Sequence, residues 1–178
     1  MIYPGKWRIT SPYGMRTLGG VTAPHKGIDV VGVGDKHVCA VADGVVAVST
    51  ITTDHSNRTW EWGNYVRVDG FDGLRYYYCH LSQRLVSPGR RISAGEHIGI
   101  EGSTGYSTGS HCHFEVRTSA GISIEPSQYL GVPNVCGEYG VDWREICRKR
   151  YGLSAGTMAY LDQYAYAADL YHKLAGGD

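Results

Sequence analysis

The sequence predicts a mainly β protein, built as an antiparallel sheet or a barrel-like sandwich, with a small helical appendage at the C-terminus. Two observations support this fold class. Short runs of β-branched and aromatic residues lie between residues 7 and 130, and they are separated by turns rich in glycine, of which the 178 residues include 25. Helical periodicity is confined to residues beyond 133. Parallel α/β folds instead alternate strands and helices along the chain.

The β region divides into short strands joined by turns. Asp43-Gly44, between two valine-rich runs, is a strong signal of a β-hairpin, and the turn at residues 70–73 indicates a second one. A loop rich in glycine and serine, residues 102–110, leads into the last strand. The strands are expected at residues 38–42, 45–50, 65–68, 74–78, 90–94, 98–100 and 111–116.

The C-terminal part of the chain has a different character, so we expect two units: a β core at residues 1–133 and a helical appendage at residues 134–178. Residues 141–150 and 155–174 favour helix, with Ser154 as the expected N-cap of the second helix. Apolar side chains recur there at helical spacing, which indicates a packing face.

Charge and hydropathy argue against several classes of partner. The 17 Lys and Arg residues balance the 17 Asp and Glu residues, which argues against a nucleic-acid-binding protein that neutralises phosphates. No run approaches the roughly 20 apolar residues that a membrane span needs. The N-terminus lacks the basic and apolar regions of a signal peptide.

None of the five cysteines has Cys-x-x-Cys spacing, which argues against a thiolate zinc site. Cys39, Cys79 and Cys112 lie in apolar or strand-like runs, where we expect buried free thiols. A disulfide between Cys136 and Cys147 stays open as an alternative.

Polar side chains in three separated segments carry the chemistry of this chain. His111 and His113 flank one residue of an expected strand, so their side chains point to the same face. They can share one metal ion, or divide metal binding and proton transfer between them. Further upstream, a turn at Gly27 can aim His25 and Asp29 at one point. Adding His113 gives a His-Asp-His set, and hydrolytic zinc sites use three such ligands and keep one position open.

His80, in the segment Tyr-Cys-His-Leu, and His111 then remain for proton transfer. Peptide hydrolysis needs a base for the water proton, an acid for the leaving amine and a donor for the oxyanion. An imidazole, with a pKa of about 6.5, suits these roles near neutral pH. The sequence leaves open which histidine starts neutral. The other histidines lack such partners and are assigned no role; they are His37, His55, His97 and His172.

The order of these segments resembles the lysostaphin-type zinc endopeptidases, which cut the peptide cross-links of bacterial peptidoglycan. The matching motifs are His-x-x-x-Asp, Tyr-x-His-Leu and Gly-x-Thr-Gly-x-Ser-Thr-Gly-x-His-x-His-Phe-Glu. The resemblance covers residues 11–130 and includes Ser-Pro-Tyr-Gly-Met-Arg at residues 11–16, Gly-Asn-Tyr-Val at residues 63–66 and Glu-Pro-Ser-Gln-Tyr-Leu at residues 125–130.

The resemblance implies a role for each site residue. It implies one zinc ion (Zn2+) held by His25, Asp29 and His113, with His80 and His111 as the catalytic pair. It also implies that residues 102–109 form one wall of a narrow groove. The candidate substrate contacts are Asn64 and Tyr106. The implied partner is bacterial cell-wall peptidoglycan, with no nucleic acid, and the implied place of action is the cell wall; the oligomeric state is not determined.

Two alternatives are weighed against this function. A non-catalytic domain of the same fold, which binds peptidoglycan or serves as a scaffold, would require a groove blocked by the helical tail or by residues 1–20. A cysteine hydrolase using Cys79 or Cys112 is disfavoured, because strand alternation turns Cys112 away from its neighbouring histidines. The absent export signal fits a phage lysin or tail component, a conjugation-associated wall hydrolase, or a domain of a larger protein.

Overall fold

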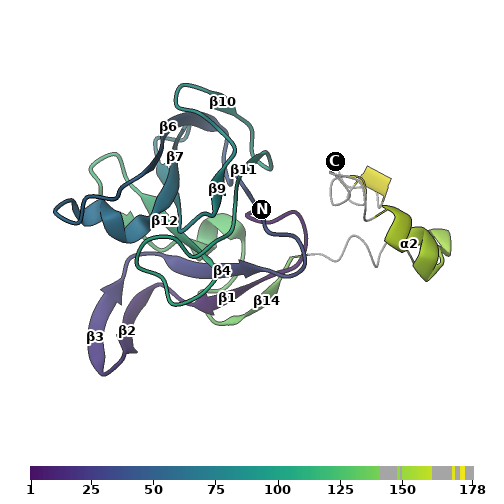
Figure 1. Cartoon of the computed structure of the whole chain (residues 1–178), viewed down its shortest axis with the longest axis horizontal. Helices are drawn as coiled ribbons and strands as arrows, with labels where there is room; N and C mark the ends of the chain where they lie inside the picture. The colour runs from purple at the N-terminus through teal and green to yellow at the C-terminus, as the bar shows by residue number, and fades with distance from the viewer. Residues whose placement is uncertain (141–147, 149, 162–169, 171–172, 175–178) are drawn as a thin grey trace.

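The structure is a computed structural model, and it describes residues 1–140, 148, 150–161, 170 and 173–174. Strands dominate the described residues, and their pairing in the main sheet is antiparallel (Figure 1). The predicted mainly β fold is therefore confirmed. The short helical segments include the 3-10 turns η1 (Arg58–Trp62) and η2 (Ser127–Leu130) and the helix α2 (Ala155–Leu161).

A nine-stranded sheet forms the body of the protein, with the strand order β10-β6-β7-β8-β12-β4-β1-β14 and β13 paired to β12. A second sheet has the order β5-β11-β9, and β2 and β3 form a separate hairpin that projects from the body (Figure 1). The strands are β1 (Trp7–Ser11), β2 (Gly14–Leu18), β3 (Val21–His25), β4 (Ile28–Gly32), β5 (His37–Cys39), β6 (Gly44–Ile51), β7 (Asn64–Gly70), β8 (Arg75–Cys79), β9 (Gln83–Arg84), β10 (Arg91–Ile92), β11 (His97–Ile100), β12 (Cys112–Arg117), β13 (Ser123–Ile124) and β14 (Gly137–Tyr139).

β12 lies between β8 and β4 and organises the core. Cys112, Phe114 and Val116 alternate along it and are fully buried. Phe114 packs against Tyr78 of β8, with ring centroids 5.2 Å apart. In the register, His113 stands opposite Asp29 on one side and opposite Cys79 on the other. The strand order therefore brings residues far apart in the sequence to one place.

The predicted hairpin at Asp43-Gly44 is wrong. β5 pairs with β11, whereas β6 pairs with β7 and β10, so the two strands belong to different sheets. Asp43 contacts other loops instead, since its side chain accepts a hydrogen bond from Ala94 N at 2.8 Å. Gly44 serves a close approach, because a Cβ there would lie 2.4 Å from Asp69 O. The second predicted hairpin is confirmed: β7 and β8 pair around the turn, with Asp69 opposite Arg75.

The helical prediction is confirmed where the structure describes the chain. Ser154 caps α2, since its Oγ accepts a hydrogen bond from Thr157 N at 3.1 Å. Residues 141–147, 149 and 162–169, which hold most of the remaining helical prediction, lie outside the described residues. No described helix is long and apolar enough to cross a membrane.

Cys39, Cys79 and Cys112 are buried, as predicted, and none of the three forms a disulfide. Cys136 is also free and is exposed, and its proposed partner Cys147 lies outside the described residues. The β body extends beyond residue 133, because β14 pairs with β1. The division at residue 133 stays a proposal, and a boundary after Tyr139 agrees better with this pairing.

Candidate metal centre

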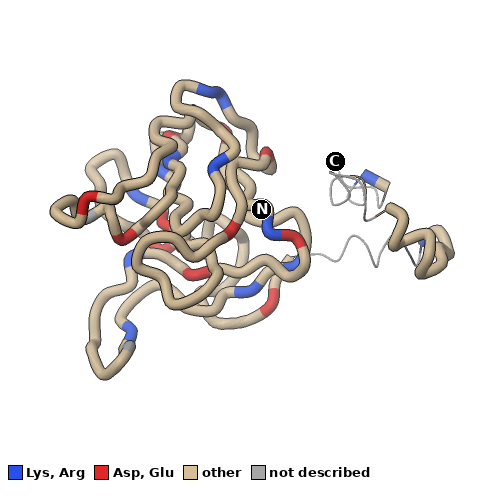
Figure 2. Tube along the Cα trace, viewed as in Figure 1, with Lys and Arg blue, Asp and Glu red and all other residues tan. Residues whose placement is uncertain are grey.

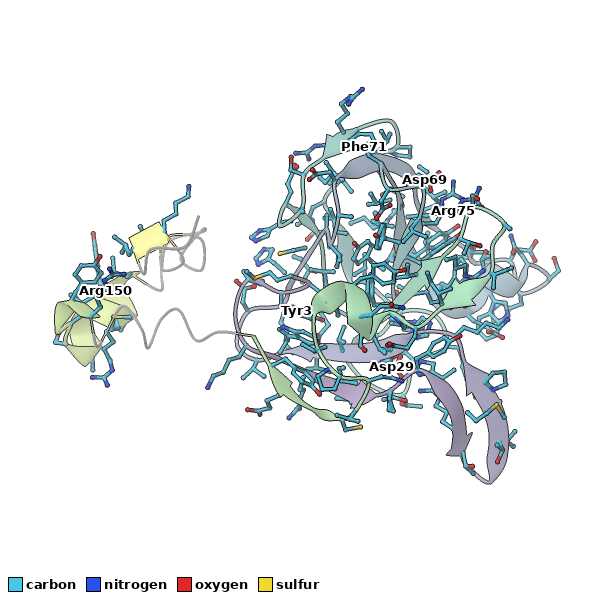
Figure 3. All side chains as sticks on the ribbon, turned by 180° about the vertical axis from the view of Figure 1, so that it is seen from behind. Tyr3, Asp29, Asp69, Phe71, Arg75 and Arg150 are labelled. Carbon is cyan, nitrogen blue, oxygen red and sulfur yellow. The ribbon has the colours of Figure 1, made fainter. Side chains whose placement is uncertain are left out.

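A tight turn brings His25, at the end of β3, towards Asp29 on β4. Figure 3 labels Asp29. Gly27, in this turn, passes directly over β12. A Cβ at this position would lie 2.5 Å from Phe114 O and 2.8 Å from His113 Cε1, so a larger residue would push the turn away. Glycine is therefore required for the close approach of the two segments.

Three donor atoms converge beside β12. His25 Nε2 lies 3.1 Å from Asp29 Oδ1 and 3.0 Å from His113 Nδ1, and His113 Nδ1 lies 2.8 Å from Asp29 Oδ1. Donor atoms of a tetrahedral zinc site lie about 3.3 Å apart when each is about 2.0–2.1 Å from the metal. Within the described part of the chain, this is the one cluster of at least three His, Cys, Asp or Glu side chains that could hold an ion. The donor set fits zinc.

The protein also fixes the outer nitrogen of both imidazoles. His25 Nδ1 donates to Pro12 O at 2.8 Å, and His113 Nε2 donates to Glu115 Oε1 at 3.0 Å. With these protons directed outward, the two inner lone pairs and Asp29 Oδ1 face one another. Such electron pairs repel unless a proton or a cation lies between them. The arrangement is therefore suited to holding a positive charge.

The pKa values agree with this interpretation. Burial lowers the pKa of His113, but hydrogen bonds to Asp29 and Glu115 outweigh it and raise the pKa to about 9. Burial acts on Asp29 in the opposite sense, yet hydrogen bonds from His113 and His25 hold its pKa well below the ordinary value. Arg16 Nη1 donates to Asp29 Oδ2 at 2.7 Å, so the carboxylate presents Oδ1 to the imidazoles.

Two further histidines lie beside the three donors. His111 Nε2 is 3.6 Å from Asp29 Oδ1, and the ring centroids of His80 and His111 are 4.7 Å apart. Each ring donates its Nδ1–H to a main-chain carbonyl at 2.8 Å, from His80 to Thr104 and from His111 to Gly109. The Nε2 atom of each neutral ring is therefore left without a proton and can exchange one with a bound molecule.

His80 has an unusual backbone. Its φ is 63°, and it is the one described residue other than glycine with a positive φ. The chain bends there after β8, and His80 N donates to Trp62 O at 2.8 Å. Burial, followed by the nearby His113 and His111, lowers the pKa of His80 to about 4. Strained backbone of this kind concentrates at functional sites.

The two candidate substrate contacts differ in their surroundings. Asn64 begins β7, and its main-chain N–H donates to Thr104 Oγ1 at 2.9 Å. Tyr106 is 74% exposed, and its ring lies edge-on to Trp60 at 6.0 Å between centroids. Tyr106 N donates to Glu61 O at 2.9 Å, which joins the loop of residues 102–110 to η1.

Three residues that orient the site were not predicted from the sequence. Arg16 holds Asp29, Thr104 holds His80, and Glu115 holds His113. All three belong to motifs or loops that the sequence singled out, but no role could be assigned to them from spacing. Alternation along the last strand does place Glu115 on the face of His113, which was the available signal.

The fold and these side chains define a class of protein, namely an antiparallel β protein with a buried His-Asp-His cluster beside two more histidines. The profile of the family described as Peptidase family M23 matches residues 23–126. The chain belongs to this family. The predicted resemblance to lysostaphin-type peptidases is confirmed.

One relative and two solved structures illustrate the similarity. The peptidoglycan DD-endopeptidase ShyA of Vibrio cholerae is 39% identical over 119 residues, which are 64% of this chain and 26% of ShyA. The catalytic domain of lysostaphin from Staphylococcus simulans has a TM-score of 0.60 and 29% identity, over 73% of this chain and 93% of that domain. A zinc-containing peptidase from Vibrio cholerae has a TM-score of 0.56 and 28% identity, over 67% of this chain and 36% of the other. The chain thus spans about a quarter of the length of ShyA.

Proposed function

We propose that this protein is a zinc-dependent endopeptidase that hydrolyses peptide cross-links of bacterial peptidoglycan. One observation carries the proposal: His25, Asp29 and His113 direct three electron-pair donors at one point, at separations of 2.8–3.1 Å. Membership of the family supports the reaction class, and the similarity to the peptidoglycan DD-endopeptidase ShyA supports the substrate. The cell wall is accordingly the proposed place of action.

His25, Asp29 and His113 would hold the zinc ion. When bound, zinc supplies Lewis-acid chemistry, which makes hydroxide available near neutral pH and polarises a carbonyl group. Asp29 contributes one negative charge to a site that otherwise has neutral imidazoles, and Arg16 balances its outer oxygen.

His80 and His111 would carry out the proton transfers. Their Nδ1 atoms are tied to the main chain, so their Nε2 atoms are fixed in direction. Burial lowers the pKa of His80, so its ring is neutral at working pH and its Nε2 can accept a proton. His111, closer to Asp29, is placed to donate to the oxyanion or the leaving amine once protonated.

Substrate binding would use the loop of residues 102–110. We propose that the exposed ring of Tyr106 contacts the peptide or the adjoining sugar, and that Asn64 contributes beside it. The glycines of this loop permit a slim peptide to approach closely.

The test is the loss of turbidity of purified cell walls from several bacteria. We expect clearing by the native protein, and at least a hundredfold slower clearing after chelation or with His111→Ala. His37→Ala is the matched control, because His37 pairs with Asp35 and stacks on His97 away from the donor cluster. Clearing that survives both chelation and His111→Ala would contradict the proposal.

The same assay separates the non-catalytic alternative. A scaffold would bind zinc and sediment with the walls but leave them turbid under every condition. Mass spectrometry of fragments released from a defined cross-linked muropeptide would then identify the cleaved bond for an active protein. A new amine and a new carboxylate at one peptide position are the expected products.

A further inference from the structure

Glu101 is a buried acid that the proposed chemistry does not use. Its side chain is 0% exposed and accepts four hydrogen bonds. Oε2 accepts from Tyr3 Oη and Gly32 N, each at 2.8 Å. Oε1 accepts from Lys36 Nζ at 2.8 Å and from Ser110 Oγ at 2.7 Å. A buried carboxylate is costly unless it is fully paired, so this network is a specific feature of the fold.

The network joins both ends of the loop of residues 102–110, which leads directly into His111. Glu101 directly precedes this loop, and Ser110, which its carboxylate binds, ends it. The ends are also joined by the main chain, since His111 N donates to Gly102 O at 2.9 Å. Glu101 itself is held by Lys36 O, which accepts from Glu101 N at 2.8 Å. The carboxylate thus fixes the closure of the loop against the sheet.

The direction of the His111 ring depends on this closure. Its Nδ1 donates to Gly109 O at 2.8 Å, and Gly109 lies inside the loop. Ser110 is exposed, and it is the one residue between that carbonyl and His111. By contrast, His113 is held by β4, β8 and Glu115. A loosened loop would therefore disturb His111 before it disturbed the donor cluster.

We propose that Glu101 is a positioning residue for His111, and that it acts through Ser110. This inference rests on the proposed function, because it assigns His111 a role in turnover. The carboxylate keeps the loop closed, and the closed loop keeps Nε2 of His111 directed at the centre. Zinc binding and substrate affinity should depend on it little, whereas the rate of the chemical step should depend on it strongly.

Ser110→Ala is the decisive variant, because removing Glu101 itself would leave buried donors unpaired and can unfold the chain. Lys36→Met is the matched control. It removes a donor to the same oxygen, Oε1, but that donor lies outside the loop, between β4 and β5. Both Ser110 and Lys36 are at least partly exposed, so water can reach the vacated positions.

We expect Ser110→Ala to lower kcat roughly tenfold on a soluble cross-linked peptide fragment of peptidoglycan, with KM and zinc content unchanged. Lys36→Met should change kcat less than twofold, although it removes a charge and lowers the melting temperature more. Equal kcat values for Ser110→Ala and native protein would overturn the inference. The inference would also be overturned if, across the two variants, kcat fell in proportion to the fall in melting temperature.

A second readout needs no substrate. The imidazole resonances of His111, assigned in an NMR spectrum by their absence from His111→Ala, should shift or broaden in Ser110→Ala and stay unchanged in Lys36→Met. Unchanged resonances in Ser110→Ala would refute the positioning role. If the native protein cut no peptide, the proposed function would fail, but this spectrum would still decide whether Glu101 positions His111.

Discussion

Each of the four histidines around the candidate centre has one ring nitrogen tied to the protein and the other turned inward. The outer partners are Pro12 O for His25, Thr104 O for His80, Gly109 O for His111 and Glu115 for His113. Three of these partners are main-chain carbonyls and one is a carboxylate. A carboxylate accepts the stronger hydrogen bond, and it is found on a proposed zinc ligand, where it makes the imidazole a better donor.

Glu115→Ala should therefore weaken zinc binding. We expect a rise in the Kd for zinc of roughly 10–100-fold, because His113 loses the partner that directs its Nδ1 lone pair inward. The measurement is competition with a chelator of known affinity. Glu138→Ala, an exposed acid on β14, is the control and should leave the Kd unchanged. Equal affinities for both variants would show that Glu115 does not orient the ligand.

Zinc binding should also depend on pH in a defined direction. The pKa of His113 is about 9 in the metal-free protein, so a proton competes with zinc below that pH. The apparent affinity should rise roughly tenfold per pH unit from about 6.5 to 9 and then level off. Titration calorimetry in buffers of different ionisation enthalpy would detect the released proton. Affinity independent of pH over this range would contradict the assignment.

Stability of the metal-free protein should change in the opposite sense. The folded pKa of His113 is above its unfolded value of about 6.5, so its charge stabilises the fold fully below that pH. This contribution is lost as the pH rises through 9. His80, with its depressed pKa of about 4, contributes little above about pH 7.5, where it is neutral in both states, and it destabilises the fold as the unfolded imidazole takes up a proton at lower pH. The measurement is the melting temperature in the presence of a chelator, which should fall as the pH rises towards 9.

At the scale of elements, two glycines let η1 and the loop of residues 102–110 approach each other. Gly63 and Gly105 have φ values of 60° and 73°, and a Cβ on Gly105 would lie 2.4 Å from Gly63 N and 2.5 Å from Glu61 O. The next residue back along the loop is Thr104, which holds His80. Packing of these two backbones therefore positions a proposed catalytic side chain.

Gly105→Ala should displace the loop and lower turnover at least tenfold, with zinc retained. Gly89→Ala is the matched control: its φ of 86° imposes a similar backbone strain, but a Cβ there meets nothing within 4 Å. Both variants should lose some stability, and only Gly105→Ala should lose activity. If Gly89→Ala lost as much activity as Gly105→Ala, the loss would be due to backbone strain and not to the position of the loop.

The sequence predicted the positions of the strands better than which strands pair and which distant segments are in contact. Strand alternation placed Cys112 and Phe114 in the core and both neighbouring histidines on the other face, and the structure agrees. The Asp43-Gly44 signal failed, because a glycine that permits close packing and a glycine that forms a turn look alike in one sequence. The positive φ of His80 and the role of Thr104 were not predictable, since both arise from contacts between distant segments.

At the scale of the whole molecule, positive and negative side chains are interspersed along the chain (Figure 2). The nine-stranded sheet brings β4, β8 and β12 side by side, and these strands carry or precede most of the site. α2 is drawn apart from the strands in Figure 1. β14 completes the edge of the sheet, where Tyr139 contacts Trp7 at 5.2 Å between ring centroids.

Truncation after Gly140 should leave the fold and zinc binding intact, whereas truncation after Pro133 should lower the melting temperature. The shorter chain loses β14, and it loses Asn134, which bonds both the N–H and the C=O of Tyr13 at 2.9 Å. We expect a decrease of about 5–10 °C for the shorter chain. Equal melting temperatures for the two truncated chains would place the boundary at residue 133.

The most direct test is the zinc stoichiometry of three proteins, measured by elemental analysis after metal removal, reloading and desalting. We expect one zinc ion per chain for the native protein and for His111→Ala, and none retained by Asp29→Ala. Full zinc occupancy in Asp29→Ala, or its loss in His111→Ala, would contradict the assignment of His25, Asp29 and His113 as the ligands.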